Sequence, residues 1–470
     1  MNQRKHVEYL VIGAGPTGLS SISEILTQGV DPSAILVIDP EEKLTSGGTK
    51  NLTPTRRRQS ILDVAVRERQ NLGMGKGSQN LSRVGLESGA YSWGLSCLPP
   101  INFETTQTFV SKVDFMDDYK NLMLDWRVQA ELSNSNFQNC FPIYGEELNA
   151  LRRKKLSIDL VSADSRILHS RLALSSINVD PLEGCDFSGK CFDACPNNSP
   201  WNPQKGWRKI KNRFPEVEHL QDWVVTLSPV KQSISTKKQV ITYEKLILSA
   251  GWRSTSKLIR TFNNQEFTFQ NTPVVLLPIY FRAKVSEQDF YEHFNYTDLI
   301  IPEIKHRAMV SLSQIYLPTS EIAGRIIAQM PQVLFSIAKK FGNKDFHKLF
   351  NHVGVVMIFL PPTINSVNQK DVQEDLNRVV KYLNGVLGNV GAKVLNFKTN
   401  YLLNGSSHHV GAIGESSEKD RGVNSRIFDS MIKSKVFITD TSALPVLLPG
   451  PHTATSAALS KSISRVAVHQ

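Results

Sequence analysis

The chain has 470 residues, of which 40% are hydrophobic and 21% are charged, and its formal net charge is +11. This length allows a large buried core divided over two or three structural units, and the composition is ordinary for a globular protein. A basic surface would suit nucleic acid, acidic lipids or an anionic substrate. The basic runs Arg56–Arg58 and Arg152–Lys155 are short and scattered, and no nucleic-acid motif accompanies them. We therefore interpret the charge as a diffuse excess and expect no nucleic-acid partner.

The apolar run near the N-terminus is short and leads directly into glycines, which favours a buried strand over a secretory signal. No window reaches the roughly 18 apolar residues that a membrane-spanning helix needs. On these grounds we expect a cytoplasmic protein. The five cysteines are an odd number, which, without a signal peptide, favours reduced thiols.

Residues 7–40 have the pattern of a strand, a tight turn, a helix and a second strand. We expect the strands at Val7–Ile12 and Ile35–Ile38 and the helix over Leu19–Leu26. Such a βαβ unit requires parallel strands joined by a right-handed crossover. The predicted fold class is therefore α/β, with a doubly wound, parallel, Rossmann-like sheet.

The turn between the first strand and its helix reads Gly13-Ala14-Gly15-Pro16-Thr17-Gly18 and matches the dinucleotide-binding pattern G-x-G-x-x-G. Gly13 would permit the turn, Gly15 the approach of a pyrophosphate, and Gly18 close packing of helix and strand. Asp39 follows the second strand and is placed to accept hydrogen bonds from a ribose hydroxyl. The motif alone does not separate FAD from NAD, but by analogy its N-terminal position favours FAD.

The middle of the chain is less regular. We expect inserted loops over 41–220, including an irregular loop at 184–206, then a hairpin of Trp223–Leu227 with Val240–Tyr243 and a strand at Leu246–Ala250. From 272 to 405, strand-like runs alternate with amphipathic helical stretches, which predicts a separate α+β unit on a mainly antiparallel sheet. The expected elements of this unit are the strands Val274–Phe281, Met309–Tyr316 and Val353–Leu360 and the helices Ile322–Phe341 and Asp371–Leu387. The chain then closes with a strand at Val436–Asp440 and a helix near Thr455–Val468.

Four further segments carry a family resemblance. They are a strand ending in Ala250-Gly251, a loop from Ser88 to Gly94, a histidine turn at Ser406–Gly414, and Asp440-Thr441-Ser442 to Pro445 followed by His452-Thr453. Together with the glycine turn, and in this order, they resemble the glucose–methanol–choline (GMC) oxidoreductases. The resemblance implies a discontinuous FAD-binding domain over 1–270, a substrate-binding domain over 271–405 and a return to the FAD-binding domain over 406–470.

The resemblance also implies roles for individual residues. His408 falls on the family's catalytic histidine, and His452 falls on its partner. Cofactor contacts would come from the glycine turn, from Asp39, and from the positions Ser88, Gly89, Ser92, Trp93, Gly94, Ala250, Gly251, Asp440, Thr441, His452 and Thr453. The loop near 90 resembles that of the pyranose-oxidising branch but has no histidine to bond FAD covalently, so we expect dissociable FAD.

The resemblance implies oxidation of an alcohol or sugar hydroxyl, in which a neutral imidazole takes the hydroxyl proton and flavin N5 takes the hydride. The electron acceptor, whether O₂, a quinone or a protein, stays open, and so does the choice of His408 or His452 as base. A flavin monooxygenase, a non-redox lyase and a non-catalytic flavin-bound partner subunit are the alternatives. Cys185, Cys191 and Cys195 lie close together, but three thiols are too few for a typical zinc or iron–sulfur site, and we expect no metal. Docking of the Ile322–Phe341 helix on a membrane is the less favoured interpretation of that segment.

Overall fold

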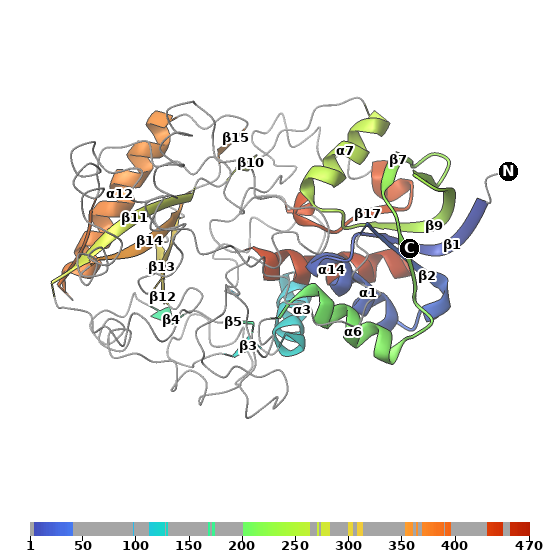
Figure 1. Ribbon diagram of the computed structural model, residues 1–470, viewed down its shortest axis with the longest axis horizontal. Coiled ribbons are helices and arrows are strands. Elements are labelled where there is room, and N and C mark those ends of the chain that lie inside the picture. Colours follow the sequence, from blue (N-terminus) through green and yellow to red (C-terminus); the bar gives the residue numbers. More distant parts are fainter. Residues whose placement is uncertain are drawn as a thin grey trace, which may run out of the picture.

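The computed structural model describes the residues 4–40, 97, 112–126, 128–129, 168–169, 172–173, 201–263, 270–271, 274–282, 299–303, 308–313, 353–360, 363–364, 369–389, 391–395, 430–444 and 452–470. Figure 1 shows that their helices and strands form two groups, each built around one larger sheet. The first group contains the glycine turn and both ends of the chain.

The sheet of the first group has seven strands in the order β6-β2-β1-β9-β8-β7, with β17 also paired to β9. Its strands are β1 (Arg4–Ile12), β2 (Ile35–Asp39), β6 (Glu218–Gln221), β7 (Val224–Ser228), β8 (Ser233–Thr236), β9 (Val240–Leu248) and β17 (Val436–Ile438). All pairings among β6, β2, β1, β9 and β17 are parallel, whereas β7 and β8 join antiparallel at one side. The expected α/β fold with a parallel sheet is therefore confirmed, and the strands contributed by 218–248 and 436–438 show that this unit is assembled from discontinuous segments.

Strand β9 differs from the sequence expectation because it is continuous. The sequence pattern predicts a hairpin strand at Val240–Tyr243 and a separate strand at Leu246–Ala250, but Val240–Leu248 forms one strand along β1. Its outer edge is divided, since β8 pairs with its first half and β17 with its second half. The partner of β7 is therefore β8, whose alternating sequence Ser-Ile-Ser-Thr is too polar to read as a strand.

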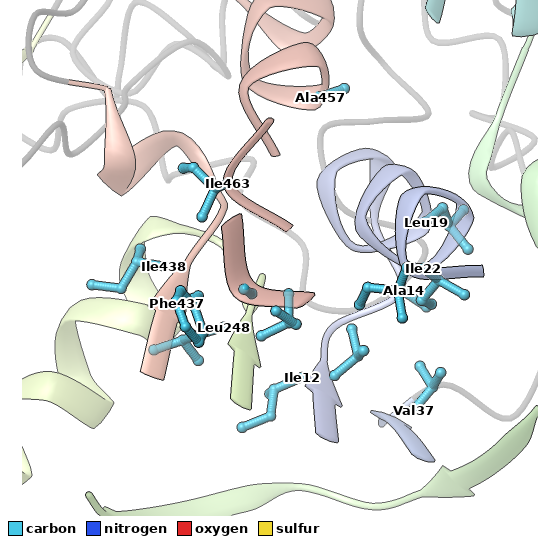
Figure 2. Packing of buried hydrophobic residues seen from close by; sticks show 14 of the residues in the cluster. Ile12, Ala14, Leu19, Ile22, Val37, Leu248, Phe437, Ile438, Ala457 and Ile463 are labelled. Atoms are coloured by element: carbon cyan, nitrogen blue, oxygen red, sulfur yellow. The ribbon is translucent and has the colours of Figure 1, made fainter. Parts of the chain in front are cut away.

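Helices cover the parallel sheet and complete its core. They are α1 (Pro16–Thr27), α3 (Lys112–Asp125), α6 (Pro203–Arg213), α7 (Trp252–Asn263) and α14 (Thr453–His469). Figure 2 shows apolar side chains from β1, β2, β9 and β17 beside those of α1 and α14, including Ile12, Leu248, Phe437 and Ile22. Helix α14 packs along α1 and α3 and is buried over most of its length, which its many Ala and Ser residues permit because small side chains allow close approach.

A network of ion pairs joins α1, α3 and α14. The Arg465 Nε donates to Glu24 Oε1 at 2.9 Å, and its Nη2 contacts Asp118 Oδ1. The carboxylates of Glu24 and Asp118 are almost fully buried, at 4% and 1% side-chain exposure, whereas Arg465 is 32% exposed. Lys461 Nζ lies 3.9 Å from Glu24 Oε2 and adds a second cation. Buried carboxylates require such partners, so this network fixes the three helices relative to one another.

Helix α6 corrects a second expectation, because the irregular loop predicted over 184–206 gives way to a helix at Pro203. The Asn202 side chain accepts a hydrogen bond from the Lys205 N–H at 3.1 Å, and Pro203 occupies the first turn. An Asn followed by Pro is a typical helix start, so Asn202-Pro203 is the sequence signal for this helix.

The second sheet has six antiparallel strands in the order β16-β11-β14-β13-β12-β4. They are β4 (Leu168–His169), β11 (Val274–Phe281), β12 (Leu299–Glu303), β13 (Ala308–Ser313), β14 (Val353–Phe359) and β16 (Ala392–Val394). Helix α12 (Gln369–Gly388) lies beside β16 and buries a stripe of apolar residues, among them Leu376, Val379 and Leu383. The predicted strands at 274 and 353 and the helix at 371 are found within two residues of their expected starts, whereas Ile322–Phe341 lies outside the described residues.

Two short antiparallel pairs complete the described strands: β3 (Val128–Gln129) with β5 (Leu172–Ala173), and β10 (Gln270–Asn271) with β15 (Thr363–Ile364). The boundaries at 270 and 405, and the role of the second unit in binding substrate, stay predictions. Within the described ranges, no helix is both long enough and apolar enough to cross a membrane.

Candidate cofactor-binding site

The glycine turn joins the end of β1 to the start of α1, and its first and third glycines are fixed by close backbone contacts. Gly13 has a φ of +97°, and a Cβ there would lie 2.3 Å from the Ser249 carbonyl oxygen. A Cβ at Gly18 would lie 1.9 Å from the Gly13 carbonyl oxygen. Both positions therefore exclude any side chain, which agrees with the turn and packing roles that the motif predicts.

Gly15 differs because a Cβ there would meet no atom within 4 Å. It is the N-cap of α1, Pro16 follows in the first turn, and no side chain caps the helix. The first turn also has no acidic residue. The first turn of α1 thus has no side-chain cap, and the space beside its N-cap residue is open, which is the arrangement that binds phosphate groups.

Asp39 ends β2 beside this turn and is 5% exposed. Its Oδ2 accepts a hydrogen bond from the Ala14 N–H at 2.8 Å, and the Gly13 N–H donates to the Ile38 carbonyl at 2.8 Å. The carboxylate therefore holds the glycine turn in place. This structural role accompanies the predicted contact with a ribose hydroxyl, which stays a prediction.

The end of β9 meets the same turn from the other side. The Ser249 N–H donates to the Ile12 carbonyl at 2.9 Å, and Ala250 and Gly251 follow, with a φ of +77° at Gly251. Helix α7 begins directly afterwards, and the Ser249 hydroxyl shares a hydrogen bond with the Thr439 hydroxyl at the end of β17. The carboxyl ends of β1, β2, β9 and β17 therefore converge, as expected for the ligand-binding edge of an open parallel sheet.

Asp440 connects this edge to α7. Its Oδ1 accepts the Ser442 N–H at 2.8 Å, and its Oδ2 accepts the hydroxyl of Thr255. Burial raises the pKa of the Asp440 carboxyl, opposed by hydrogen bonds from Thr255, Ser442 and the Gly251 backbone. Thr255 was not among the residues predicted for the site. Its place in the first turn of a helix that follows a strand-end glycine was the available signal.

His452 is the N-cap of α14, it is 8% exposed, and Thr453 begins the helix. The His452 carbonyl accepts the Ser456 N–H at 2.8 Å, and further along α14 the Ser460 hydroxyl donates to the Thr17 carbonyl in α1 at 3.0 Å. Helix α14 also contacts the short helix η7 (Thr441–Ala443). The structure therefore brings His452, Thr453, Asp440 and Thr441 to the same edge of the sheet as the glycine turn.

The remaining predicted positions are Ser88, Gly89, Ser92, Trp93, Gly94, His408 and the three clustered cysteines, and they lie outside the described residues. Within the described part of the chain, no group of three or more metal-ligating side chains occurs. The residues that are described fit a dinucleotide: an open, uncapped helix N-terminus for its phosphates and a buried carboxylate at the end of the neighbouring strand.

Comparison of the whole structure with solved structures gives full-length similarity to oxidases. Pyridoxine 4-oxidase from Mesorbium loti has a TM-score of 0.57 and 11% identity, and the match covers 99% of both chains. A mutant of formate oxidase from Aspergillus oryzae RIB40, studied for FAD modification, has a TM-score of 0.54 and 8% identity, covering 99% of this chain and 98% of that one. A fungal aryl-alcohol oxidase has a TM-score of 0.54 and 11% identity, with 99% of both chains covered.

These neighbours are GMC oxidoreductases. The chain has the GMC fold. No family model matches its sequence, and a search of curated proteins gives no match. The GMC fold is thus recognised from the structure and from short sequence motifs. The low sequence identity to these oxidases establishes the fold alone, and not the activity.

Proposed function

We propose that this chain binds FAD and oxidises a hydroxyl group to a carbonyl. The observation that carries the proposal is the open N-terminus of α1 at Gly15, placed where the carboxyl ends of four parallel strands converge. A full-length fold match to three oxidases supports the same conclusion. A non-catalytic scaffold would need the same cofactor site, so the experiment must measure reduction of the flavin as well as its binding.

In this proposal the α1 N-terminus binds the pyrophosphate through the N–H groups of Thr17 and Gly18, while Asp39 accepts a hydrogen bond from the ribose. Ala250, Gly251, Asp440, Thr441 and Thr453 would contact the rest of the cofactor. Bound FAD supplies a hydride acceptor at flavin N5. The absence of a histidine between Ser88 and Gly94 supports dissociable rather than covalent binding.

The protein's own contribution is to remove the hydroxyl proton and to hold the oxygen. We assign proton removal to His408, and the hydrogen bond that stabilises the developing alkoxide to His452. His452 suits that role because it is buried at the amino end of α14, where the helix dipole favours negative charge.

For the substrate we propose a small primary alcohol, aromatic or sugar-like, with O₂ as electron acceptor. The neighbours named for pyridoxine and aryl alcohols support the aromatic class, and all three are named as oxidases. The reaction balances as RCH₂OH + O₂ → RCHO + H₂O₂, in which the alcohol loses one proton and one hydride.

The test is anaerobic bleaching of flavin absorbance in the purified protein by pyridoxine, benzyl alcohol and glucose in turn. We expect a yellow protein that at least one of these compounds bleaches, with H₂O₂ released when air is readmitted. His408→Ala should keep the flavin and lose most of its turnover, whereas His469→Ala, at an exposed position, should not change turnover. A colourless folded protein that does not bind added FAD would refute the proposal, and a flavin that no hydroxyl compound reduces would refute its catalytic part.

Acid precipitation tests the mode of binding. We expect the flavin to stay in the supernatant, because the Ser88–Gly94 loop has no histidine that could bond it covalently. Flavin that remains with the precipitated protein would contradict dissociable binding.

A further inference from the structure

Thr255 lies in the first turn of α7, and its hydroxyl bonds to a distant part of the chain. The residue is fully buried, at 0% exposure, and its N–H donates to the Gly251 carbonyl at 2.9 Å. In a helix, a threonine hydroxyl commonly points to solvent or bonds to the carbonyl four residues earlier. The Thr255 hydroxyl instead donates to Asp440 Oδ2, just after β17. This bond therefore joins α7 to the C-terminal part of the first unit.

Asp440 is 3% exposed, and its partners are hydrogen-bond donors. Oδ1 accepts the Ser442 N–H at 2.8 Å, Oδ2 accepts the Thr255 hydroxyl, and the Gly251 backbone adds a further hydrogen bond. Among the described residues, no lysine, arginine or histidine forms an ion pair with this carboxylate. A buried carboxylate without a cation depends on its hydrogen bonds, so the Thr255 hydroxyl is one of the few groups that hold Asp440.

Three segments of the candidate site meet at this carboxylate. They are the turn after β9, through Gly251, the first turn of α7, through Thr255, and η7, through Ser442. Helix α7 contacts η7, and η7 contacts α14, whose N-cap is His452. The Asp440 carboxylate therefore sets the position of the β9–α7 turn relative to η7.

The turn at Gly251 has little other support. Gly251 has a φ of +77°, it is exposed, and a Cβ there would meet no atom within 4 Å. Glycine has more conformational freedom than any other residue, and this one has no side chain to pack against its surroundings. The hydrogen bonds at Asp440 therefore restrict a turn that borders an open space.

A second buried carboxylate offers a comparison. Asp118, between α3 and α14, also accepts a hydroxyl, that of Ser462, but it contacts the Arg465 guanidinium as well. Asp440 has the hydroxyl without the cation. Burying a charge that no cation pairs lowers stability, and features that cost stability are found at functional sites. The arrangement around Asp440 therefore indicates a role beyond holding helices together.

We propose that Thr255 is a positioning residue for the cofactor. Through Asp440 it would hold the Ala250-Gly251 turn and Thr441 in one arrangement, so that the flavin half of FAD meets a preformed surface. A preformed site binds more tightly, because less conformational freedom is lost on binding. Thr255 would act through Asp440 and not by touching the cofactor. This inference rests on the proposed function, since it concerns how the same site binds FAD.

Release of FAD from the purified full-length holoprotein on dilution, followed by flavin fluorescence, tests this inference. Thr255→Val keeps the shape of the side chain and removes its hydroxyl, whereas Thr255→Ser keeps the hydroxyl. We expect Thr255→Val to weaken FAD binding about tenfold, and Thr255→Ser to bind FAD within about threefold of the unchanged protein. ADP lacks the flavin half, so its dissociation constant, measured by displacement of FAD, should change less than about twofold in Thr255→Val.

Ser462→Ala is the matched control, because the Ser462 hydroxyl also donates to a buried carboxylate. Both Ser462→Ala and Thr255→Val should lower the melting temperature, but only Thr255→Val should weaken FAD binding. Thr255→Ala, which also lacks the hydroxyl, replaces Thr255→Val if that variant does not fold. Unchanged FAD affinity without the hydroxyl, or equal losses of FAD and ADP affinity, would overturn the inference. An unchanged protein that binds no FAD would instead refute the proposed function.

Discussion

Gly13 and Gly15 stand two positions apart in one turn, but an added methyl group would meet different surroundings at each. At Gly13 it would clash with a backbone carbonyl at a φ that side chains rarely adopt. At Gly15 it would project into open space. Gly13 is therefore required for folding. Gly15 is required only if a bound ligand occupies the open space beside it.

This difference gives a paired test at the scale of single residues. Gly13→Ala should lower the free energy of unfolding by about 3 kcal/mol or more, through clash and backbone strain. Gly15→Ala should change it by less than about 1 kcal/mol but weaken FAD binding at least about tenfold, because the methyl group occupies the proposed pyrophosphate position. Urea unfolding and fluorescence titration with FAD measure the two effects. A Gly15→Ala protein with unchanged FAD affinity would contradict the assigned site.

At the scale of elements, α14 is held by ion pairs as well as by apolar packing. Replacing Arg465 would leave the buried carboxylates of Glu24 and Asp118 with fewer partners. Arg378 offers a comparison, since it pairs with Glu374 and Asp375 on the exposed side of α12. Both arginines lie on a helix and contact two carboxylates. The carboxylates beside Arg465 are buried, whereas those beside Arg378 are partly exposed.

We expect Arg465→Met to lower the free energy of unfolding by about 3 kcal/mol, at the lower end for a broken buried pair because Arg465 is partly exposed. Arg378→Met should cost less than about 1 kcal/mol, because exposed pairs are screened by water and salt. Thermal unfolding followed by circular dichroism compares the variants. Similar losses for both would show that the contacts among α1, α3 and α14 do not depend on this network.

Sequence patterns predicted the elements whose residues follow a strong period and missed those defined by tertiary contacts. Ile35–Ile38 is a buried apolar run, and Val274–Phe281 is an apolar run in which Val275, Leu277 and Ile279 are buried, and both strands were placed closely. Strand β8 was not predicted, because Ser233 and Ser235 give no apolar pattern of their own. Its position is set by pairing with β7 and β9. The glycine turn and Asp39 could be located from spacing alone, but no sequence pattern could show that Thr255 would donate to Asp440.

At the scale of the whole molecule, the two larger sheets differ in their relation to the proposed cofactor. The glycine turn, Asp39 and the end of β9 all belong to the first sheet, whereas β11–β14 form part of the second. A ligand that binds only the folded site stabilises the elements that form it. Local opening of the two units should therefore respond differently to FAD.

Amide hydrogen exchange can measure this difference. We expect added FAD to slow exchange in β1, α1 and the end of β9 at least about tenfold, and to change β11 and β14 much less. The same protein with added AMP, which lacks the flavin, serves as the control and should protect the glycine turn only weakly. Equal protection of both sheets would contradict the assignment of the cofactor to the first one.

Helix α14 lies in the middle of the first core, yet it is synthesised long after α1, against which it packs. Until it leaves the ribosome, the face of α1 against which it packs has no permanent cover. The N-terminal unit of the nascent chain therefore stays incomplete throughout the synthesis of the second sheet, and its core closes only when this late helix is added.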